Sequence, residues 1–393
     1  MRILVLTSVY PRTTDDTEVP WMRETVRRLR ARGHHVEILA PSWRGLRRHQ
    51  IDETVVHRFR YGPARLEILT GEEGAPARIA RHPWLQLMAI PYIACGALAC
   101  LRHARRARVD VLHVHWPFPH GLMALPTRLL ARIPVLPNFH GAELLMSERK
   151  RWVRPLLRLV LRFARLAVAN SSFTAGRVAA LSPLPVRIVP YGTAQGAGAP
   201  GARTPQAGER FRALFVGRHI ERKGIIHLID AFALLPPDRF ELVIAGEGDQ
   251  TEALRARAAT IPGGHIRFTG RLPAEELRAA YASSHAFVLP AIVDSRGDTE
   301  GLGVVLVEAT EYGLPLVASA VGGIVDVVEE GVTGLALPPQ DAPAIAQALR
   351  RLAEDPALAE TLVAGARARV RSLFDWDRVM DGLEDSLRDA TRR

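Results

Sequence analysis

The sequence predicts an α/β protein of two doubly wound, Rossmann-like domains that face a central cleft. Short apolar runs alternate with helical patterns along the 393 residues, and the alternation pauses once, in a stretch rich in Gly, Ala and Pro (192–210), before it resumes. Apolar runs separated by helices are typical of parallel strands covered on both faces. Because ligands of such folds bind at the carboxyl ends of the strands, we expect the site in the cleft.

The first domain is predicted over residues 1–191. Its strands are expected where apolar runs end in turns, at 3–8, 35–41, 109–115, 134–140, 166–171 and 186–192. Helical periodicity separates these runs, most clearly at 18–32 and 152–164. The opening run, MRILVLTSVYPR, is shorter than a signal-peptide core and is predicted to be the first strand.

The second domain is predicted over residues 211–373, after a linker at 192–210. Its strands are expected at 211–217, 240–246, 266–270, 286–291 and 314–320. A final helix is predicted in the last segment, 374–393.

One apolar segment, residues 84–101, contains eighteen residues without a formal charge. This length is the lower limit for a membrane-spanning helix. Pro91 and Gly96 interrupt the segment, and the strand pattern resumes directly after it. We therefore expect a buried helix, with one face against a membrane surface as a further role, rather than a spanning helix.

Charge is divided unevenly between the two halves. Residues 1–190 contain 30 Lys and Arg against 13 Asp and Glu, whereas the remainder contains 22 against 28. Such asymmetry indicates either an anionic partner of the first half or only a solvated, Arg-rich surface. The two cysteines, Cys95 and Cys100, indicate no disulfide framework or zinc site and fit a reducing compartment.

A predicted phosphate site follows the strand at 211–217. Arg218 ends that strand, and Lys223 with Gly224 opens a helix predicted to reach Leu235. A helix N-terminus favours anions through its free amides and its dipole, and two cations on the same turn suit a diphosphate. The alternative is that both are ordinary surface charges.

A second helix N-terminus is predicted around Gly301 and Gly303, where the amides of Leu302 to Val304 can face a phosphate. Glu300 precedes this helix, at the position of the group attached to that phosphate. Glu308 is predicted about two turns into the helix, where a carboxylate could accept bonds from ribose hydroxyls. The alternatives are that Glu300 complements the helix dipole and Glu308 pairs with an arginine.

The second half resembles the retaining, nucleotide-sugar-dependent glycosyltransferases of family 4, which have the two-domain GT-B fold. Five blocks carry the resemblance in order: FVGRHIERKGIIHLIDAFALL, LVIAGEGD, IRFTGRLPAEELRAAYASSHAFVLPA, EGLGVVLVEATEYGLPLVAS and VGGIVDVVEEGVTGLALPPQD. The similarity runs from about residue 211 to residue 341. The resemblance further implies that the last helix, 374–393, crosses back to the first domain.

The resemblance implies roles at the donor. Arg218 and Lys223 would hold the diphosphate of the donor, and Glu300 would bind its sugar. Glu308 would hold the ribose, and the backbone around Arg271 and Leu272 would meet the base. Phosphate contacts are implied for the stretch Gly301, Leu302, Gly303 and Val304. In the first domain, His140 in the sequence FHG would face the donor sugar across the cleft.

The first domain departs from the family in two places. The loop 10–24 lacks the paired glycines of many members, so it is a candidate acceptor contact through Asp15, Asp16 or Glu18. The segment 190–195 lacks the Asp that often follows its Gly. His115 and His120 are further candidate contacts of the acceptor.

The expected reaction is sugar transfer with retention of anomeric configuration, in cell-surface glycan or glycolipid synthesis. Cations and helix N-termini would stabilise the departing diphosphate, and this phosphate would take the proton of the acceptor. No Asp-x-Asp motif follows a strand, so no metal and no other cofactor is expected. The expected partners are a nucleotide sugar, a sugar or lipid-linked acceptor and, as a candidate, an anionic membrane surface, at a cytoplasmic location.

Other functions remain as alternatives at this point. A nucleotide-sugar epimerase or a phosphorylase of similar build would share the phosphate site, and a non-catalytic sensor of nucleotide sugars would not need Glu300. A nucleic-acid partner is not expected, because no recognised binding motif appears. An NAD enzyme is disfavoured because no G-x-G-x-x-G follows the first strand.

Overall fold

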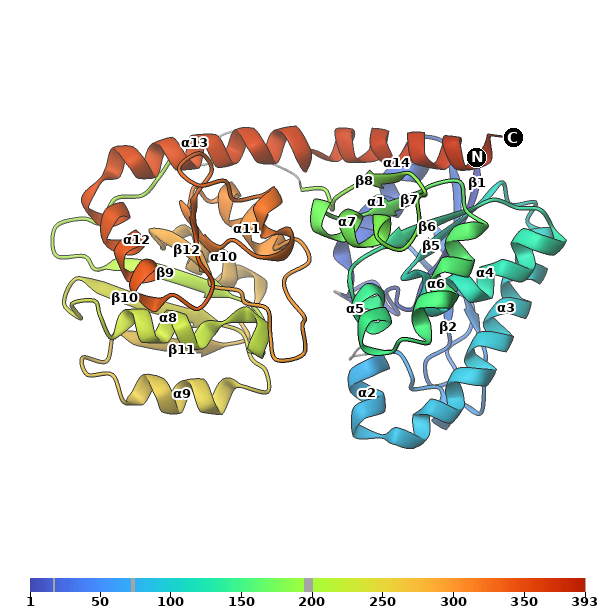
Figure 1. The fold of residues 1–393 in the computed structure, drawn as a ribbon, viewed down its shortest axis with the longest axis horizontal. Coiled ribbons are helices and arrows are strands. Elements are labelled where there is room, and N and C mark those ends of the chain that lie inside the picture. The colour runs from blue at the N-terminus through green and yellow to red at the C-terminus, as the bar shows by residue number, and fades with distance from the viewer. Residues whose placement is uncertain (17, 72–74, 194–200, 393) are drawn as a thin grey trace. The chain divides into compact units, whose positions relative to one another are not determined.

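The computed structural model describes residues 1–16, 18–71, 75–193 and 201–392, which form two compact units. Unit 1 consists of Met1–Gly192 together with Val379–Arg393, and unit 2 consists of Thr193–Arg378 (Figure 1). Of the predicted linker, 194–200 lies outside the described residues, and 201–210 contains no helix or strand.

Unit 1 is built on an eight-stranded sheet with the order β3-β4-β2-β1-β5-β6-β7-β8. All described pairs are parallel except β3 with β4. The strands are β1 (Arg2–Leu6), β2 (His35–Pro41), β3 (His49–Ile51), β4 (Thr54–Phe59), β5 (Val111–His115), β6 (Val135–Phe139), β7 (Ala167–Ala169) and β8 (Val186–Ile188). Their alternation with helices confirms the predicted α/β class for this unit.

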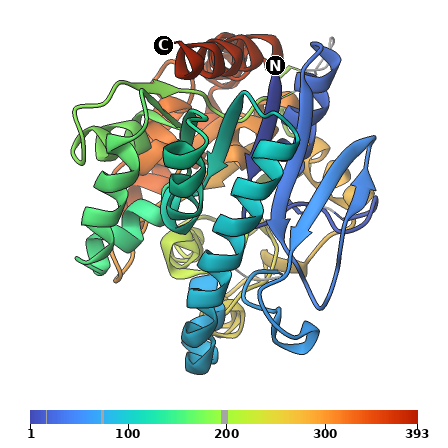
Figure 2. The ribbon, with the colours of Figure 1, turned by 90° about the vertical axis from the view of Figure 1, so that its right-hand side faces the viewer.

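The helices of unit 1 follow the strands along the chain. They are α1 (Pro20–Ala31), η1 (Ala64–Leu66), α2 (Ala75–Arg81), η2 (Pro83–Met88), α3 (Ala89–Arg106), α4 (Pro117–Leu130), α5 (Ala142–Arg149), α6 (Val153–Arg162) and α7 (Ser172–Ala179). Figure 2 shows α3 lying across one face of the sheet.

The sequence did not predict β3 and β4. Strand β3 has three residues, and β4 carries His57 and Arg58 within its six. Neither segment offers the apolar run by which the other strands were recognised, because these two strands form the edge of the sheet.

The apolar segment at 84–101 forms most of the short 3-10 helix η2 and of helix α3. The helical stretch Pro83–Arg106 is long and apolar enough to cross a membrane by length and composition alone, a test that core helices also pass. One face of α3 packs in the core of unit 1 through Tyr92, Gly96, Cys100 and Ala104. The opposite side exposes Leu87, Ile90 and Leu98.

The predicted interruption of this segment is wrong within α3. Pro91 lies in the first helical turn, where its missing N–H has no intrahelical partner to lose. Gly96 lies where the helix approaches Met123, whose sulfur would be 2.5 Å from an added Cβ. Both residues therefore fit an unbroken helix.

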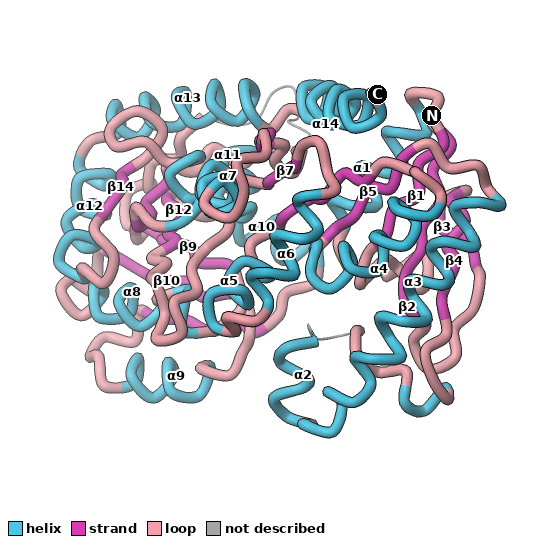
Figure 3. The backbone as a smooth tube through the Cα atoms, turned by 45° about the vertical axis from the view of Figure 1, so that its right-hand side comes forward, coloured by secondary structure: helices cyan, strands magenta, loops and turns pink. Residues whose placement is uncertain are grey.

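Unit 2 is built on a six-stranded sheet with the order β11-β10-β9-β12-β13-β14, and all its described pairs are parallel (Figure 3). The strands are β9 (Phe211–Val216), β10 (Phe240–Ala245), β11 (Ile266–Gly270), β12 (Ala286–Leu289), β13 (Leu316–Ser319) and β14 (Leu335–Leu337). Only the three-residue strand β14 was missed in the sequence.

The helices of unit 2 alternate with these strands. They are η3 (Glu221–Lys223), α8 (Ile225–Phe232), α9 (Thr251–Ala259), α10 (Ala274–Ala282), α11 (Val304–Glu311), η4 (Gly322–Asp326), α12 (Ala342–Glu354) and α13 (Pro356–Leu373). The last helix, α14 (Trp376–Thr391), begins in unit 2 and continues in unit 1. Helix α8 ends at Phe232, one turn before the predicted end.

Candidate active site

The turn after β9 is shaped by a glycine. It runs through η3 to Gly224, which has a φ of +63° and begins α8. A Cβ added to Gly224 would lie 1.9 Å from the carbonyl oxygen of Pro290, in the loop after β12. Only glycine therefore lets these two loops approach, and both follow strands whose carboxyl ends share one edge of the sheet.

The approach of these loops brings Lys223 to Glu300. The ammonium of Lys223 donates to Oε2 of Glu300 at 2.5 Å, and the Arg222 guanidinium donates to the same oxygen at 3.0 Å. The three side chains are only 9–16% exposed. Both bonds end on Oε2, so Oε1 has no hydrogen-bond partner among the described residues.

The charges of this cluster depend on one another. Burial by itself would raise the pKa of Glu300, but Lys223 and Arg222 outweigh burial and lower this pKa to about 2. Burial lowers the pKa of Lys223 from its ordinary value, against the attraction of Glu300. The cluster is thus an ionised group of two cations and one carboxylate at neutral pH.

Arg222 was not predicted as a site residue, whereas Arg218 was. Arg218 is solvent-exposed and its side chain forms no hydrogen bond or ion pair with other described residues, but the charges of Arg222 and Glu300 both act on its pKa, so it lies near the cluster. Arg222 instead reaches Glu300 and lies 3.7 Å from Asp298. The only signal in the sequence was its position beside Lys223.

The N-terminus of α11 begins at Gly303, which has a φ of +78°. The loop before α11 packs closely against Gly322 and Gly323. A Cβ added to either glycine would lie about 2 Å from the carbonyl oxygen of Glu300 or Gly301. The amide of Gly323 donates to the carbonyl of Glu300 at 2.9 Å. Glu300 thus lies just before a helix whose first amides have no intrahelical acceptor, as the sequence predicted.

Glu308 is the fifth residue of α11, so it lies little more than one turn from the start rather than two. Its partner is the Tyr281 hydroxyl, which donates to Oε2 at 3.2 Å, and not an arginine. Tyr281 in turn stacks on Tyr312, with ring centroids 4.8 Å apart. Burial raises the pKa of Glu308, and the bond from Tyr281 only partly offsets this effect.

Arg271 and Leu272 follow β11, the edge strand of the sheet, and Arg271 is exposed. Neither forms a described hydrogen bond with Glu308 or with the Lys223 cluster. The structure therefore brings Lys223 and Glu300 into contact, and it places the other predicted donor residues on helix α11 and on loops that follow the strands of this sheet.

His140 of unit 1 directly follows β6 and lies among aromatic rings. Its Nε2 is 2.9 Å from Nδ1 of His115, and its Nδ1 is 2.7 Å from the Tyr191 hydroxyl. Trp21 packs against His140 at 5.1 Å between ring centroids and stacks on Tyr191 at 4.3 Å. Trp21 and Tyr191 were not predicted, and only the sheet brings them together.

The histidines of this aromatic cluster are neutral at physiological pH. Burial lowers the pKa of His140 to about 3, with a smaller effect of the His113 charge. Burial also lowers the pKa values of His113 and His120 to about 4. His120 bonds the Tyr92 hydroxyl through Nε2 and the Trp116 carbonyl through Nδ1, which leaves no ring nitrogen for an acceptor.

Glu143 lies beside His140 and was also not predicted. One carboxylate oxygen accepts the backbone amide of His140 at 2.8 Å, and the other has no described partner. Burial raises the pKa of Glu143 to about 7. Two nearby amide oxygens, of Asn138 and Asn170, are likewise buried without a described partner. Unpaired buried polar atoms of this kind are costly unless a ligand or water satisfies them.

Two acidic side chains of the loop before α1 already form contacts with Arg12 of the same loop. Arg12 pairs with Glu18 at 2.9 Å, and the Arg12 amide donates to Asp16 at 3.0 Å. Of the three predicted acceptor contacts in this loop, Asp15 alone is exposed.

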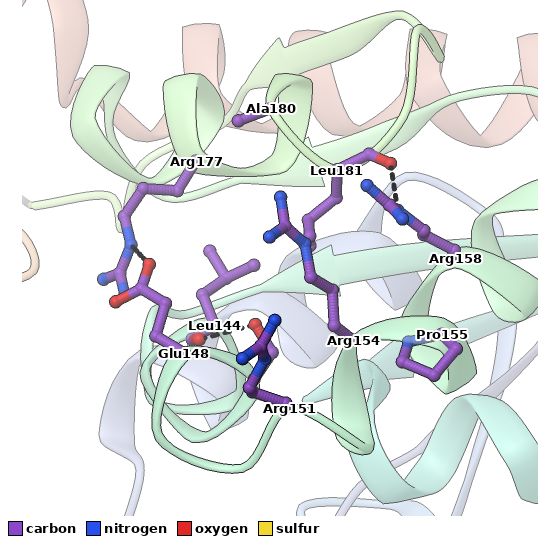
Figure 4. Close-up of a pocket in the computed structure, with 10 residues that line it drawn as sticks. Leu144, Glu148, Arg151, Arg154, Pro155, Arg158, Arg177, Ala180 and Leu181 are labelled. Carbon is purple, nitrogen blue, oxygen red and sulfur yellow. Dashed lines mark hydrogen bonds and ion pairs between the residues drawn. The ribbon is translucent and has the colours of Figure 1, made fainter.

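A basic cavity of about 730 Å³ lies in unit 1 between α5, α6 and α7 (Figure 4). Its charged lining consists of Arg151, Arg154, Arg158, Arg177 and Glu148. Arg177 pairs with Glu148 at 2.7 Å. The excess of arginine makes this cavity suited to an anion, and its lining reaches Leu144 of α5, four residues after His140.

The chain belongs to glycosyltransferase family 4, a class of enzymes with the GT-B fold. Residues 21–194 match the family described as Glycosyltransferase Family 4, and residues 202–369 match the family described as Glycosyl transferases group 1. The predicted family and fold class are thereby confirmed, and the chain is a glycosyltransferase.

Particular relatives include two mycobacterial enzymes. The GDP-mannose-dependent alpha-(1-6)-phosphatidylinositol monomannoside mannosyltransferase of Mycobacterium tuberculosis is 28% identical over the full length of both chains. The phosphatidyl-myo-inositol mannosyltransferase of Mycobacterium leprae is 31% identical over 88% of this chain and 86% of that one.

Solved structures share the fold at low identity. Sucrose-phosphate synthase from Thermosynechococcus elongatus superposes with a TM-score of 0.75 at 20% identity, over 99% of this chain and 98% of that chain. Anabaena HepE in complex with UDP-glucose superposes with a TM-score of 0.70 at 17% identity, over 99% and 100%.

Proposed function

We propose that this glycosyltransferase uses a nucleotide-diphosphate sugar and transfers the sugar with retention of configuration to an anionic, lipid-linked acceptor. The cluster of Lys223, Arg222 and Glu300 at the start of α11 carries the proposal. The donor diphosphate would lie against Arg218, Lys223 and the first amides of α11, where cations and helix amides favour developing negative charge.

Glu300 would orient the donor sugar in this proposal. Lys223 and Arg222 hold its Oε2, which leaves Oε1 for a sugar hydroxyl. Glu308 would accept bonds from the ribose, beside the hydroxyl of Tyr281. The acceptor would attack from the face that the diphosphate leaves, and the departing phosphate would take the acceptor proton. No step of this route requires a metal ion.

Mannose from GDP-mannose and an inositol phospholipid are the first substrates to test, because two mycobacterial relatives carry names with these substrates. A thermal-shift panel of GDP-, UDP- and ADP-sugars would identify the donor, since a ligand that binds the folded state raises its melting temperature. We expect one nucleotide family to raise it. Product analysis by NMR would then show the anomer, and conversion of the donor without acceptor would instead support an epimerase.

The Arg-lined cavity is the proposed place of the acceptor phosphate. Helix α6 presents Arg154, Arg158 and Leu159 to solvent, and Trp152 before it is 58% exposed. Together with the exposed apolar side of α3, this surface suits peripheral attachment to anionic lipid.

Vesicle binding tests this acceptor surface. We expect the protein to pellet with anionic vesicles at low salt and to be released as salt rises. Arg151→Glu with Arg154→Glu should weaken pelleting and leave nucleotide binding intact, and Arg239→Glu, an exposed arginine of unit 2, is the matched control. Equal binding to neutral vesicles would shift the assignment to α3. Binding to neither would favour a soluble acceptor.

A further inference from the structure

Three imidazoles converge on one carboxylate in unit 1, at a place that the transfer reaction does not use. Nε2 of His103 lies 2.6 Å from Oε2 of Glu37, and Nε2 of His57 lies 3.0 Å from the same oxygen. Nε2 of His35 lies 2.9 Å from the other oxygen, Oε1. The ligand atoms of Glu37, His57 and His103 all lie within 4.8 Å of one another.

The fold determines this convergence. His35 and Glu37 are two residues apart on β2, so their side chains lie on the same face of the sheet. The register of β2 with β4 pairs Leu39 with His57, which places His57 on that face as well. His103 lies on α3, one residue before the buried Ala104, where this helix packs over the same strands.

We propose that Glu37, His57 and His103 bind a divalent transition metal, with Zn²⁺ as the best fit. Zinc takes imidazole nitrogen and carboxylate oxygen at about 2.0–2.2 Å, and tetrahedral ligand atoms are then about 3.4 Å apart. The observed nitrogen–oxygen distances need to open by less than 1 Å to reach that spacing. Each neutral imidazole would bind through Nε2 and keep its ring proton on Nδ1.

The ligand set also favours zinc over the hard cations. Two imidazoles and one carboxylate match the borderline preference of zinc, whereas magnesium and calcium prefer oxygen alone. His35 holds Oε1 of Glu37 and thereby orients the carboxylate, or it can turn to complete a fourth position. The three ligand side chains are 16–23% exposed, which leaves a path for the ion from solvent.

The bound metal would connect β2, β4 and α3. Helix α3 also carries the exposed apolar residues Ile90 and Leu98. A metal bond across β2, β4 and α3 would fix the position of α3 on the sheet, so the role is structural and involves none of the donor residues of unit 2.

The test is metal binding by the full chain without an oligohistidine tag, after removal of metal by chelation. We expect one Zn²⁺ per chain by calorimetry, a rise in melting temperature on adding Zn²⁺, and visible absorption bands of tetrahedral Co²⁺ when Co²⁺ replaces it. His57→Gln, His103→Gln and Glu37→Gln should each weaken Zn²⁺ binding at least tenfold. His82→Gln, an exposed histidine of the same unit, should not change it.

Two outcomes would overturn the proposal. One is wild-type protein that binds no Zn²⁺ at micromolar concentration, with a melting temperature indifferent to Zn²⁺ and chelator; the four residues would then form a hydrogen-bonded network only. The other is Zn²⁺ binding that persists unchanged in the His57 and His103 variants, which would place the ion elsewhere. Nucleotide binding by each variant checks that unit 2 remains folded.

Discussion

The candidate residues of the two units use opposite electrostatics. In unit 2, Lys223, Arg222 and Glu300 are buried as ions, and each charge is balanced by a neighbour. In unit 1, His140 and His115 are held among Trp21 and Tyr191 as neutral rings. Both groups lie at the ends of parallel strands. The group in unit 2 is ionised, whereas the group in unit 1 is neutral.

This difference indicates a division of work. Charge that develops on a leaving diphosphate is stabilised by preorganised cations, which unit 2 supplies. A sugar ring offers hydroxyls and apolar faces, which neutral imidazoles and aromatic rings suit better than ions do. If the proposed function holds, variants of these residues in unit 2 should weaken binding of the donor phosphate and ribose. Variants of the residues in unit 1 should lower the rate of sugar transfer and leave nucleotide binding unchanged.

The largest effect is expected for Lys223→Met. The variant removes one cation from the proposed binding site of the donor diphosphate. Glu300 keeps Arg222 as its partner. Loss of such a preorganised donor costs about 2.7–4 kcal/mol in the transition state, so kcat should fall roughly 100- to 1000-fold. Arg267→Met, at an exposed arginine of the same unit, is the control. Near-normal turnover of Lys223→Met in a steady-state transfer assay would remove Lys223 from the phosphate site.

The second effect concerns nucleotide affinity. Glu308→Gln replaces a carboxylate that would accept from ribose hydroxyls, and a hydrogen bond to a charged group contributes about 1.5–3 kcal/mol. Calorimetry with the nucleotide diphosphate should show a Kd raised roughly ten- to a hundredfold. Tyr281→Phe keeps the carboxylate and removes one donor to it, so its effect should be smaller. Wild-type affinity in Glu308→Gln would contradict the ribose assignment.

A smaller effect is expected for His140→Phe, which keeps the ring volume but removes the bonds to His115 and Tyr191. Loss of a neutral hydrogen bond to the sugar would lower transfer about tenfold. Nucleotide affinity should stay within twofold of wild type, because the nucleotide contacts are assigned to unit 2. If this variant weakens nucleotide binding as strongly as Glu308→Gln, the division between the units is wrong.

The last prediction concerns the pH dependence of stability rather than catalysis. The pKa values of His113 and His120 fall from 6.5 to about 4 on folding, so between these pH values the unfolded chain binds more protons than the folded one. The stability contributed by these neutral rings is complete above pH 6.5 and is lost as pH falls toward 4.

Tryptophan fluorescence can follow this loss in unit 1, since five of the six tryptophans lie there. In urea unfolding, the free energy of unfolding should decrease as pH is lowered from 6.5 toward 4. His113→Gln should reduce the slope of this free energy against pH by about 1 kcal/mol per pH unit. An equal slope in His113→Gln and wild type would mean that His113 is not neutral in the fold.

Most of the sheet could be predicted because its strands are buried apolar runs. Strand β2 was predicted at its observed bounds, and β9 within one residue. The edge strands β3 and β14, and the strand β4 beside β3, could not be predicted, because they are short or carry polar side chains.

The sequence could predict which strands the proposed donor residues follow, but not the contacts between their side chains. Lys223 and Glu300 follow strands β9 and β12, and adjacent parallel strands end at one edge. The choice of Arg222 over Arg218 depends on how the 3-10 turn of η3 directs neighbouring side chains, which a sequence does not show. Trp21 and Tyr191 are 170 positions apart, so their stacking follows only from the sheet order.

The passage of α14 from unit 2 into unit 1 has a consequence for biosynthesis. Its buried residues Met380, Leu383 and Leu387 belong to unit 1, and His34 meets Glu384 at 2.8 Å. A ribosome makes these residues only after the whole of unit 2. Unit 1 is therefore the first unit to be synthesised and the last to be completed. Until α14 is made, the surface of unit 1 that packs against this helix remains exposed, although all of unit 2 has already been synthesised.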